Sequence, residues 1–227
     1  MTTTFARNFA VPAVLAGLLA GPVRAQTDPV PVEREPNHRT VLKNRYLQAF
    51  RVRLAPGQVS LMHRHSRDDA AVRLQAATTR NEDFGQAPGP EQSVVVGTVS
   101  ARNNEKTPAI HRVHNVGATQ FDVVDVQALE RPEGAEAPAL GPVAAENPRM
   151  RVYRFDLEAG AGTAEHVHTR PFLLVAVTPL TLTVACPAGK VRDQFKPGDM
   201  RWVERPVTHV LTNGGRATGI VVEIELK

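Results

Sequence analysis

Two short stretches of the chain carry the same histidine pattern. One reads GQVSLMHRHS, from residue 57, and the other reads GAGTAEHVHT, from residue 160. In each, a glycine is followed after five residues by His-x-His. Residues i and i+2 of a β-strand point to the same face. On strands, His63 and His65 would therefore face one cavity, as would His166 and His168, and two imidazoles on one wall form half of a metal site.

A third histidine in each half has a matching sequence context. His111 and His209 each lie three residues after a proline and four residues before an asparagine. This repeated context predicts that each of them joins the pair that precedes it. Three imidazoles with room for water suit a divalent transition metal, and Mn, Fe, Ni, Zn and Cu all remain candidates.

Only the first half places an acid at a suitable distance from its histidine pair. Asp69 lies four residues after His65, and Asp68 lies three residues after it. Adjacent strand residues face opposite ways, so only one of them should join the histidines, and the spacing favours Asp69. The matching position in the second half is Phe172, which cannot bind a metal. We therefore expect three histidines and one aspartate in the first half, and three histidines with an open or apolar side in the second.

The elements that must position these residues are predicted to be strands. Short apolar runs such as YLQAFRVRL, FDVVDVQAL, RVYRFDLEA and GIVVEIEL alternate polar with apolar residues or are rich in β-branched ones. No stretch after the first 25 residues shows a sustained helical period. The 18 prolines and 16 glycines favour many turns. The chain is therefore predicted to be all-β.

The two halves also align with each other, which predicts an internal duplication. NRYLQAFRVRLAPGQVSLMHRH matches NPRMRVYRFDLEAGAGTAEHVH at an offset of 103 residues, and the segment RPEGAEAPALGPVAAENP between the halves is typical of a linker. We expect an N-terminal arm at 26–40, module 1 at 41–131, a linker at 132–148 and module 2 at 149–227. His38, within the arm, is interpreted as solvent-exposed.

The first 25 residues are typical of a cleaved signal peptide. Arg7 precedes an apolar run from Phe9 to Ala20, and Val23-Arg24-Ala25 forms a small-x-small cleavage site. The apolar run is too short for a membrane anchor. We expect cleavage after Ala25, a periplasmic or secreted protein, and no membrane attachment after cleavage.

The composition excludes several classes of function. The net charge of +4 falls to +2 when the two arginines of the signal segment are removed, and the basic residues form no run, which argues against a nucleic-acid partner. The single cysteine, Cys186, excludes an intramolecular disulfide. Neither Ser66 nor Ser100 lies in a Gly-x-Ser-x-Gly context, which argues against a serine hydrolase. Edge strands of small barrels often pair between subunits, so the fold is compatible with a homodimer.

The combination of motifs resembles that of the cupins, whose first motif is G-x5-H-x-H-x3,4-E-x6-G and whose second is G-x5-P-x-G-x2-H-x3-N. The first motif is matched, with Asp in place of Glu, by Gly57, His63, His65 and Asp69, and again by Gly160, His166 and His168. The second is matched in part by Pro108, His111 and Asn115, and by Gly198, Pro206, His209 and Asn213. The glycine that ends the first motif is missing from both copies.

The resemblance covers nearly the whole chain after residue 25 and implies a two-module cupin, or bicupin. That fold is a pair of small antiparallel β-barrels of the jelly-roll-like, double-stranded β-helix type, with metal inside. The resemblance implies one ligand set of His63, His65, Asp69 and His111, and a second of His166, His168 and His209.

Two classes of function follow from these motifs. Free coordination positions at a module 1 metal would favour a small-molecule metalloenzyme of the dioxygenase, isomerase or decarboxylase type. A wholly apolar cavity would favour a non-catalytic cupin that binds a small ligand or a metal, or a structural one with a vestigial second site. The sequence names no catalytic residue; Tyr46, Arg73 and Arg201 are candidates only for the wall of the pocket.

Overall fold

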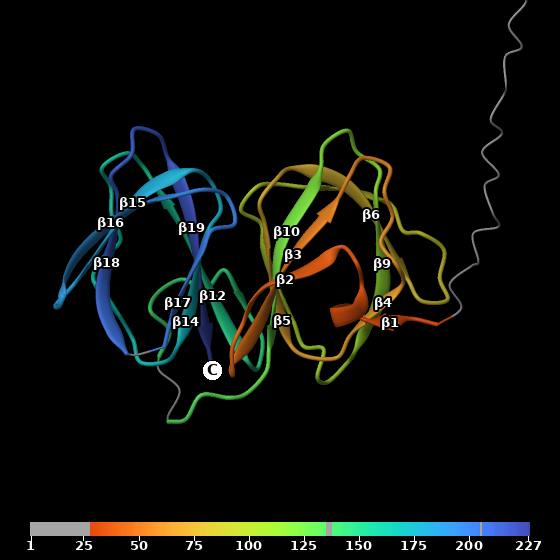
Figure 1. The fold of residues 1–227 in the computed structure, drawn as a ribbon, viewed down its shortest axis with the longest axis horizontal. Helices are drawn as coiled ribbons and strands as arrows, with labels where there is room; N and C mark the ends of the chain where they lie inside the picture. The colour runs from red at the N-terminus through yellow and green to blue at the C-terminus, as the bar shows by residue number, and fades with distance from the viewer. Residues whose placement is uncertain (1–27, 135–137, 205) are drawn as a thin grey trace, which may run out of the picture.

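The computed structural model describes residues 28–134, 138–204 and 206–227, which form two β-barrels side by side (Figure 1). The all-β prediction is confirmed, because the described part of the chain contains a single helical element, the 3-10 helix η1 (Val32–Arg34). None of the described helices is long and apolar enough to span a membrane. The predicted signal segment lies outside the described residues.

The first barrel has two sheets, with strand orders β1-β4-β9-β6-β7 and β2-β3-β10-β5-β8. Its strands are β1 (Val30–Pro31), β2 (His38–Lys43), β3 (Leu47–Leu54), β4 (His63–His65), β5 (Asp69–Arg73), β6 (Ala77–Asp83), β7 (Glu91–Val94), β8 (Val99–Arg102), β9 (Ala109–Asn115) and β10 (Phe121–Ala128). The N-terminal arm belongs to this barrel, since β1 pairs in parallel with β4 and Val32 packs into the barrel core.

The second barrel is built the same way from antiparallel strands, with orders β11-β12-β19-β14-β17 and β13-β18-β15-β16. Its strands are β11 (Ala145–Glu146), β12 (Met150–Leu157), β13 (His166–His168), β14 (Phe172–Ala176), β15 (Leu180–Cys186), β16 (Gly189–Phe195), β17 (Met200–Val203), β18 (Val207–Asn213) and β19 (Gly219–Leu226). The registers agree as well: Phe121 of β10 lies opposite Leu54, and Gly219 of β19 lies opposite Leu157. The aligned halves of the sequence thus occupy equivalent strands.

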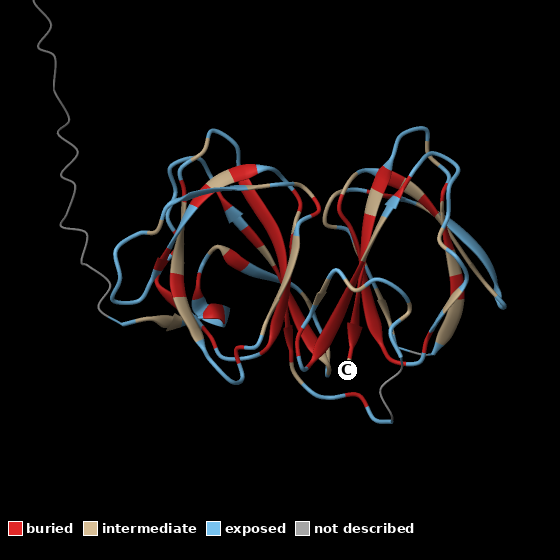
Figure 2. Ribbon diagram, turned by 180° about the vertical axis from the view of Figure 1, so that it is seen from behind, coloured by how far each residue is buried: buried red, intermediate tan, exposed pale blue. Residues whose placement is uncertain are grey.

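The barrels share an apolar core along the sheets that face each other. Val124 and Val126 of β10 and Val222 and Ile224 of β19 are fully buried in one cluster. Figure 2 shows the buried strands of the two barrels meeting in the middle of the molecule. Because side chains alternate along a strand, the residues between these positions point into the barrel interiors. Each of the two strands therefore stabilises the contact between barrels with one face and builds a polar site with the other.

Candidate metal centres

The predicted histidines of module 1 come together inside the first barrel. His63 and His65 lie on β4, and His111 lies directly opposite His63 on β9. The ring centroid of His111 is 4.7 Å from that of His63 and 5.3 Å from that of His65. All three rings are buried. Strand pairing thus unites residues that are almost fifty positions apart in the sequence.

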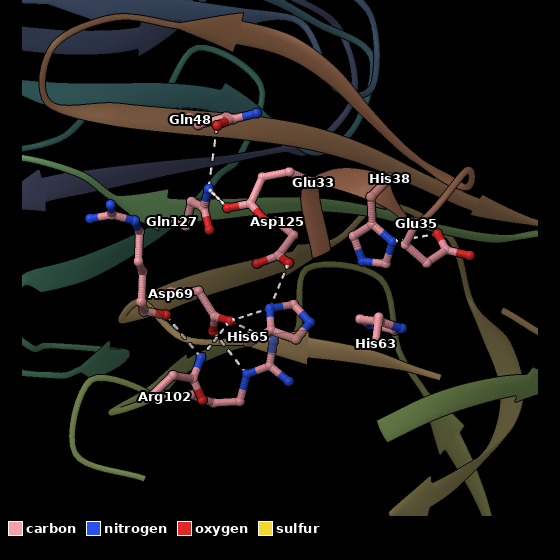
Figure 3. Close-up of polar contacts among 12 residues, drawn as sticks. Glu33, Glu35, His38, Gln48, His63, His65, Asp69, Arg102, Asp125 and Gln127 are labelled. Atoms are coloured by element: carbon pink, nitrogen blue, oxygen red, sulfur yellow. Dashed lines mark hydrogen bonds and ion pairs between the residues drawn. The ribbon is translucent and has the colours of Figure 1, made fainter. Parts of the chain in front are cut away.

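The interpretation of His38 as solvent-exposed is wrong. His38 begins β2, is only 8% exposed, and has its ring centroid 4.7 Å from that of His63. Its Nδ1 lies 2.7 Å from a carboxylate oxygen of Glu35, which leaves Nε2 available to the cluster. The nitrogens of His38, His63 and His65 lie within 4.8 Å of one another (Figure 3). No local sequence pattern predicted the burial of His38, because its position depends on the pairing of the N-terminal arm with strands that are distant in the sequence.

Asp69 lies beside His65, and ligand atoms of His65, Asp69 and Asp125 lie within 4.8 Å of one another, so its role as a ligand stays a prediction. Its carboxylate accepts hydrogen bonds from Nε and a terminal nitrogen of Arg102, at 2.8 and 2.7 Å, and from Asn104 at 2.8 Å. It also lies 3.0 Å from Nδ1 of His65 (Figure 3). The carboxylate therefore stands behind the ring and fixes its orientation, as outer-shell acids do for metal-binding histidines. The alternative, Asp68, accepts a hydrogen bond from the Glu105 backbone N–H at 2.9 Å.

A second buried acid of this barrel was missed by the sequence reasoning. Asp125 of β10 points into the interior, with one carboxylate oxygen 3.7 Å from Nδ1 of His65. Its other oxygen has no hydrogen-bond partner among the described residues. The available signal was the acid at the centre of the apolar run FDVVDVQAL.

Two imidazole nitrogens of the first barrel are buried without a hydrogen-bond partner among the described residues. Nε2 of His63 and Nε2 of His65 have no hydrogen-bond partner in the part of the chain that the structure describes. On the other side of His63, Nδ1 lies 2.8 Å from the Leu61 carbonyl oxygen, so it donates and leaves a lone pair on Nε2. A buried, unsatisfied polar atom costs about 1–3 kcal/mol. A metal ion at the open nitrogens would remove that cost, so the residues fit a metal.

Two rings of this cluster, those of His63 and His111, have a lowered pKa. Burial and the neighbouring His38 lower the pKa of His63 to about 3. Burial and His63 likewise lower the pKa of His111. Metal ions bind the neutral imidazole, so these groups are already in the binding form at neutral pH.

A cavity of about 50 Å³ adjoins the four histidines, and its wall includes Arg73 and Arg102. The prediction that Arg73 lines the pocket is confirmed. Its guanidinium carbon lies 5.6 Å from the centroid of the Phe121 ring, and its Nε is buried with no hydrogen-bond partner among the described residues. Tyr46 instead packs near Trp202 where the barrels meet, with centroids 6.1 Å apart.

The second barrel assembles its three predicted histidines in the same way. His166 of β13 lies opposite His209 of β18, with ring centroids 4.3 Å apart, and His168 lies 5.3 Å from His209. Phe172 stacks on the His168 ring with centroids 3.9 Å apart. As expected, the position that corresponds to Asp69 therefore offers no ligand.

The expectation that this second set has an open or apolar side is wrong, because a carboxylate enters from β19. One oxygen of Glu223 lies 3.2 Å from Nε2 of His166 and 3.0 Å from Nε2 of His168. Its other oxygen lies 3.3 Å from Nε2 of His209. Glu223 is fully buried. The aligned halves contained the signal, since Glu223 matches Asp125 at an offset of 98 residues.

No protein-family model and no curated protein match the chain, but solved structures do. Salicylate 1,2-dioxygenase from Pseudaminobacter salicylatoxidans is 12% identical, with a TM-score of 0.54, over 79% of this chain and 71% of that chain. The protein YhaK from Escherichia coli is 13% identical, with a TM-score of 0.56, over 79% and 85% of the two chains. A cupin domain from Bordetella pertussis Tohama I is 27% identical over 41% of this chain and 99% of that chain, with a TM-score of 0.36.

This protein is a cupin by fold. Two barrels, each with the His-x-His motif on an inner strand and the third histidine directly opposite, bear out the resemblance seen in the sequence. Inside both barrels, buried clusters of histidines and carboxylates could hold a metal ion. At identities of 12% and 13%, the two larger neighbours speak for the fold alone.

The electrostatics of the second cupin barrel are opposite to those of the first. Burial disfavours a charged His168 ring, but hydrogen bonds to Glu223 and Glu225 outweigh it and raise the pKa of His168 to about 9. Burial also disfavours a charged Glu223, yet the bonds from His166 and His168 outweigh it and lower the pKa of this carboxyl group. The second barrel thus holds an imidazolium–carboxylate network, whereas in the first barrel the pKa values of His63 and His111 are lowered.

Proposed function

We propose that this bicupin holds a divalent transition metal in its first barrel and acts there on a small molecule. The observation that carries the proposal is the pair of buried, unpartnered Nε2 atoms of His63 and His65. Each ring is held from behind, His63 by the Leu61 carbonyl and His65 by Asp69. Because each ring is fixed through its Nδ1 atom, its Nε2 lone pair is oriented to bind a metal and not to form a hydrogen bond with the neighbouring ring.

The ligands in this proposal are His38, His63 and His65, each with one ligand nitrogen within 4.8 Å of the others, and His111 is a fourth imidazole whose ring centroid lies 4.7 Å from that of His63. Asp69, the acid that the motif assigns as a ligand, instead orients His65, because Arg102 and Asn104 occupy both of its oxygens. Nitrogen-rich sites of this kind suit Fe, Zn, Cu, Ni or Mn. When bound, such a metal supplies Lewis acidity and free positions for a ligand.

The small-molecule part of the proposal is supported by the cavity and by a structural neighbour. A similar solved structure is a salicylate 1,2-dioxygenase mutant in complex with gentisate. In this chain, Arg73 and Arg102 line the cavity beside the acid Asp125, so the carboxylate of a small ligand would find guanidinium partners there.

The size of the cavity favours a second candidate, a non-catalytic cupin that binds only a very small ligand or the metal alone. Its volume of about 50 Å³ is enough for roughly three or four water molecules. An aromatic substrate would need the barrel to open. Turnover of any organic substrate by the metal-loaded protein would reject this second candidate.

The metal proposal is tested by the metal content of the chain from Gln26, purified without a polyhistidine tag. We expect His63→Ala/His65→Ala to contain about one equivalent of metal less than the unsubstituted chain. His114→Ala is the matched control, because His114 is bound to Glu82, 2.7 Å away, outside the cluster. Equal metal content in all three proteins would reject the proposal.

Two wider proposals concern the whole molecule. We propose that it is exported, on the strength of the signal-like residues 1–25; N-terminal sequencing of the exported protein should begin at Gln26. The homodimer remains a prediction from the exposed edges of small barrels, which light scattering on the purified chain would decide.

A further inference from the structure

We propose that a groove at the junction of the two barrels binds a small oxyanion that carries two or more negative charges, such as a phosphate ester or a polycarboxylate. The groove has a volume of about 290 Å³. Residues of β2 and β3 form one wall, and Gly198 with Met200, at the start of β17, forms the other. None of its lining residues belongs to the histidine clusters, so this site is separate from the metal centre of the first barrel.

Strand register gathers three arginines in this groove. Arg39 of β2 lies directly opposite Arg51 of β3, and Arg53 lies two residues farther along β3, on the same face of the sheet. Arginine stays charged at any physiological pH, and like charges directly opposite each other destabilise a sheet. A bound anion would offset this repulsion.

A single acid, Asp122 of β10, faces the three arginines. Its carboxylate accepts hydrogen bonds from Nε and a terminal nitrogen of Arg51, and it accepts another from Nε of Arg53 at 3.3 Å. In the adjoining turn, the charges of Lys196 and Asp199 balance each other. The groove therefore keeps an excess of two positive charges, and a concave site with such an excess concentrates anions.

One of the arginines is fixed in place, and the other two have donors to offer. Arg51 donates to the Pro197 carbonyl oxygen at 3.1 Å, and a Cβ atom at residue 198 would overlap its guanidinium, so Gly198 makes room for it. The guanidinium of Arg39 and the terminal nitrogens of Arg53 have no hydrogen-bond partner among the described residues. Paired N–H groups of this kind match two oxygens of a carboxylate or a phosphate.

The duplicated strands of the second barrel form a comparable groove without the excess charge. Arg154 corresponds to Arg51 at the offset of 103 residues, and it likewise reaches the other barrel, donating to the Gly97 carbonyl oxygen at 2.8 Å. Asp156 takes the place of Arg53 and accepts two hydrogen bonds from Arg154, both at 2.8 Å. This groove of about 350 Å³ contains one arginine and one acid. Contact between the barrels therefore does not itself require arginines at positions 39 and 53.

The experiment is a calorimetric titration of the chain from Gln26 with inorganic phosphate and with propane-1,2,3-tricarboxylate, at low ionic strength because salt screens exposed charges. At least one of the two probes should bind at one site, and the better probe indicates the ligand class. Arg39→Gln/Arg53→Gln should weaken binding by about tenfold or more, since two charge-assisted contacts are lost. Arg192→Gln/Arg216→Gln is the matched control. It removes the same charge from exposed positions of the second barrel outside the groove, and the affinity should not change.

Absence of binding by both probes would overturn the proposal. Equal weakening in the two double variants would also overturn it, since net charge alone would then explain the binding. Arg73→Met separates the groove from the cavity of the first barrel: unchanged affinity supports the groove, and lost affinity would assign the anion to that cavity. If Arg39→Gln/Arg53→Gln fails to fold, Arg39→Gln alone decides, with an expected weakening of about threefold if the two contacts contribute equally and additively.

Discussion

The two barrels differ in where they keep their acid. In the first, Asp69 of β5 stands behind His65 and pairs with Arg102 of β8, which lies opposite it in the sheet. In the second, the equivalent pair is Phe172 and Val203. Both members of an ion pair between a buried aspartate and a partly exposed arginine are thus exchanged together for an apolar pair. An acid behind a ring leaves the other nitrogen of that ring open. Glu223 instead lies in front of the rings, with hydrogen bonds to Nε2 of His166 and of His168 and one oxygen 3.3 Å from Nε2 of His209.

The two sites also differ in how far they are covered and in the size of the cavity beside them. The N-terminal arm covers the first cluster and contributes Val32 to the core and His38 to the site. The cavity left there is about 50 Å³, against about 410 Å³ beside His166 in the second barrel. One duplicated motif has therefore produced a covered site with a small cavity and a second site with a larger cavity beside it.

The largest effect is expected from removing the acid of the second barrel. Glu223→Ala in metal-free protein leaves the His168 imidazolium and its neighbours short of a counter-charge, so unfolding should become easier by about 3–5 kcal/mol. Urea unfolding would measure it, with Glu204→Ala as the exposed control. If the free energy of unfolding fell by less than about 1 kcal/mol, the network would not be important for the stability of the barrel.

The ion pair of the first barrel can be replaced by the apolar pair that stands at the same positions in the second barrel. Asp69→Phe alone leaves Arg102 without its partner and should destabilise the chain by about 3 kcal/mol. The double change Asp69→Phe/Arg102→Val reproduces the second barrel and should recover most of this loss, because a packed apolar pair replaces a buried ion pair at little cost. A double-mutant cycle in urea would show strong coupling; simple additivity would contradict the comparison.

Opposite pH dependences should distinguish the two sites in the metal-free protein. The pKa of His168 is raised to about 9, so its contribution to stability is full below about pH 6.5 and is lost as the pH rises through 9. The pKa of His63 is lowered to about 3, so its neutral ring contributes fully above about pH 6.5, and this is lost as the pH falls toward 3. The free energy of unfolding in urea should be measured across this pH range. In His168→Leu it should no longer fall at high pH, and in His63→Leu it should fall less at low pH. The opposite assignment of the two effects would refute the comparison.

The smallest effect is expected at Arg73, which has no counterpart charge in the second barrel, where Ala176 takes its place. Arg73→Met keeps an unbranched apolar stem and removes a buried charge, so stability should change by less than about 1 kcal/mol. Binding of a small carboxylate such as acetate to the metal-loaded protein should nevertheless weaken. Calorimetry on Arg73→Met beside Arg80→Met, a change on the exposed surface, checks both statements.

The sequence was informative wherever a regular period or the duplication applied. Alternation along strands predicted the barrels, and the shared offset grouped His111 with His63 and His209 with His166. The misses depend on pairings that no local pattern contains. His38 becomes buried because the arm adds strands to the first barrel, and Asp69 pairs with Arg102, 33 residues later, because the two lie opposite each other in the sheet.

The acids of the final strands were overlooked for a different reason. Asp125 and Glu223 stand in runs of valine and isoleucine whose other face builds the core between the barrels. A strand that is buried on both faces has no polar side to mark its inward residues, so only the alignment of the halves could have drawn attention to them.

The most direct test is the number of metal ions in the unsubstituted chain from Gln26, purified without a tag and loaded with Zn²⁺ before dialysis. Two equivalents per chain are predicted, falling to one in His63→Ala/His65→Ala and to one in His166→Ala/His168→Ala. A single equivalent that disappears with only one of these changes would leave the other barrel without metal. No bound metal in any of the three proteins would contradict the metal-binding assignment of both barrels.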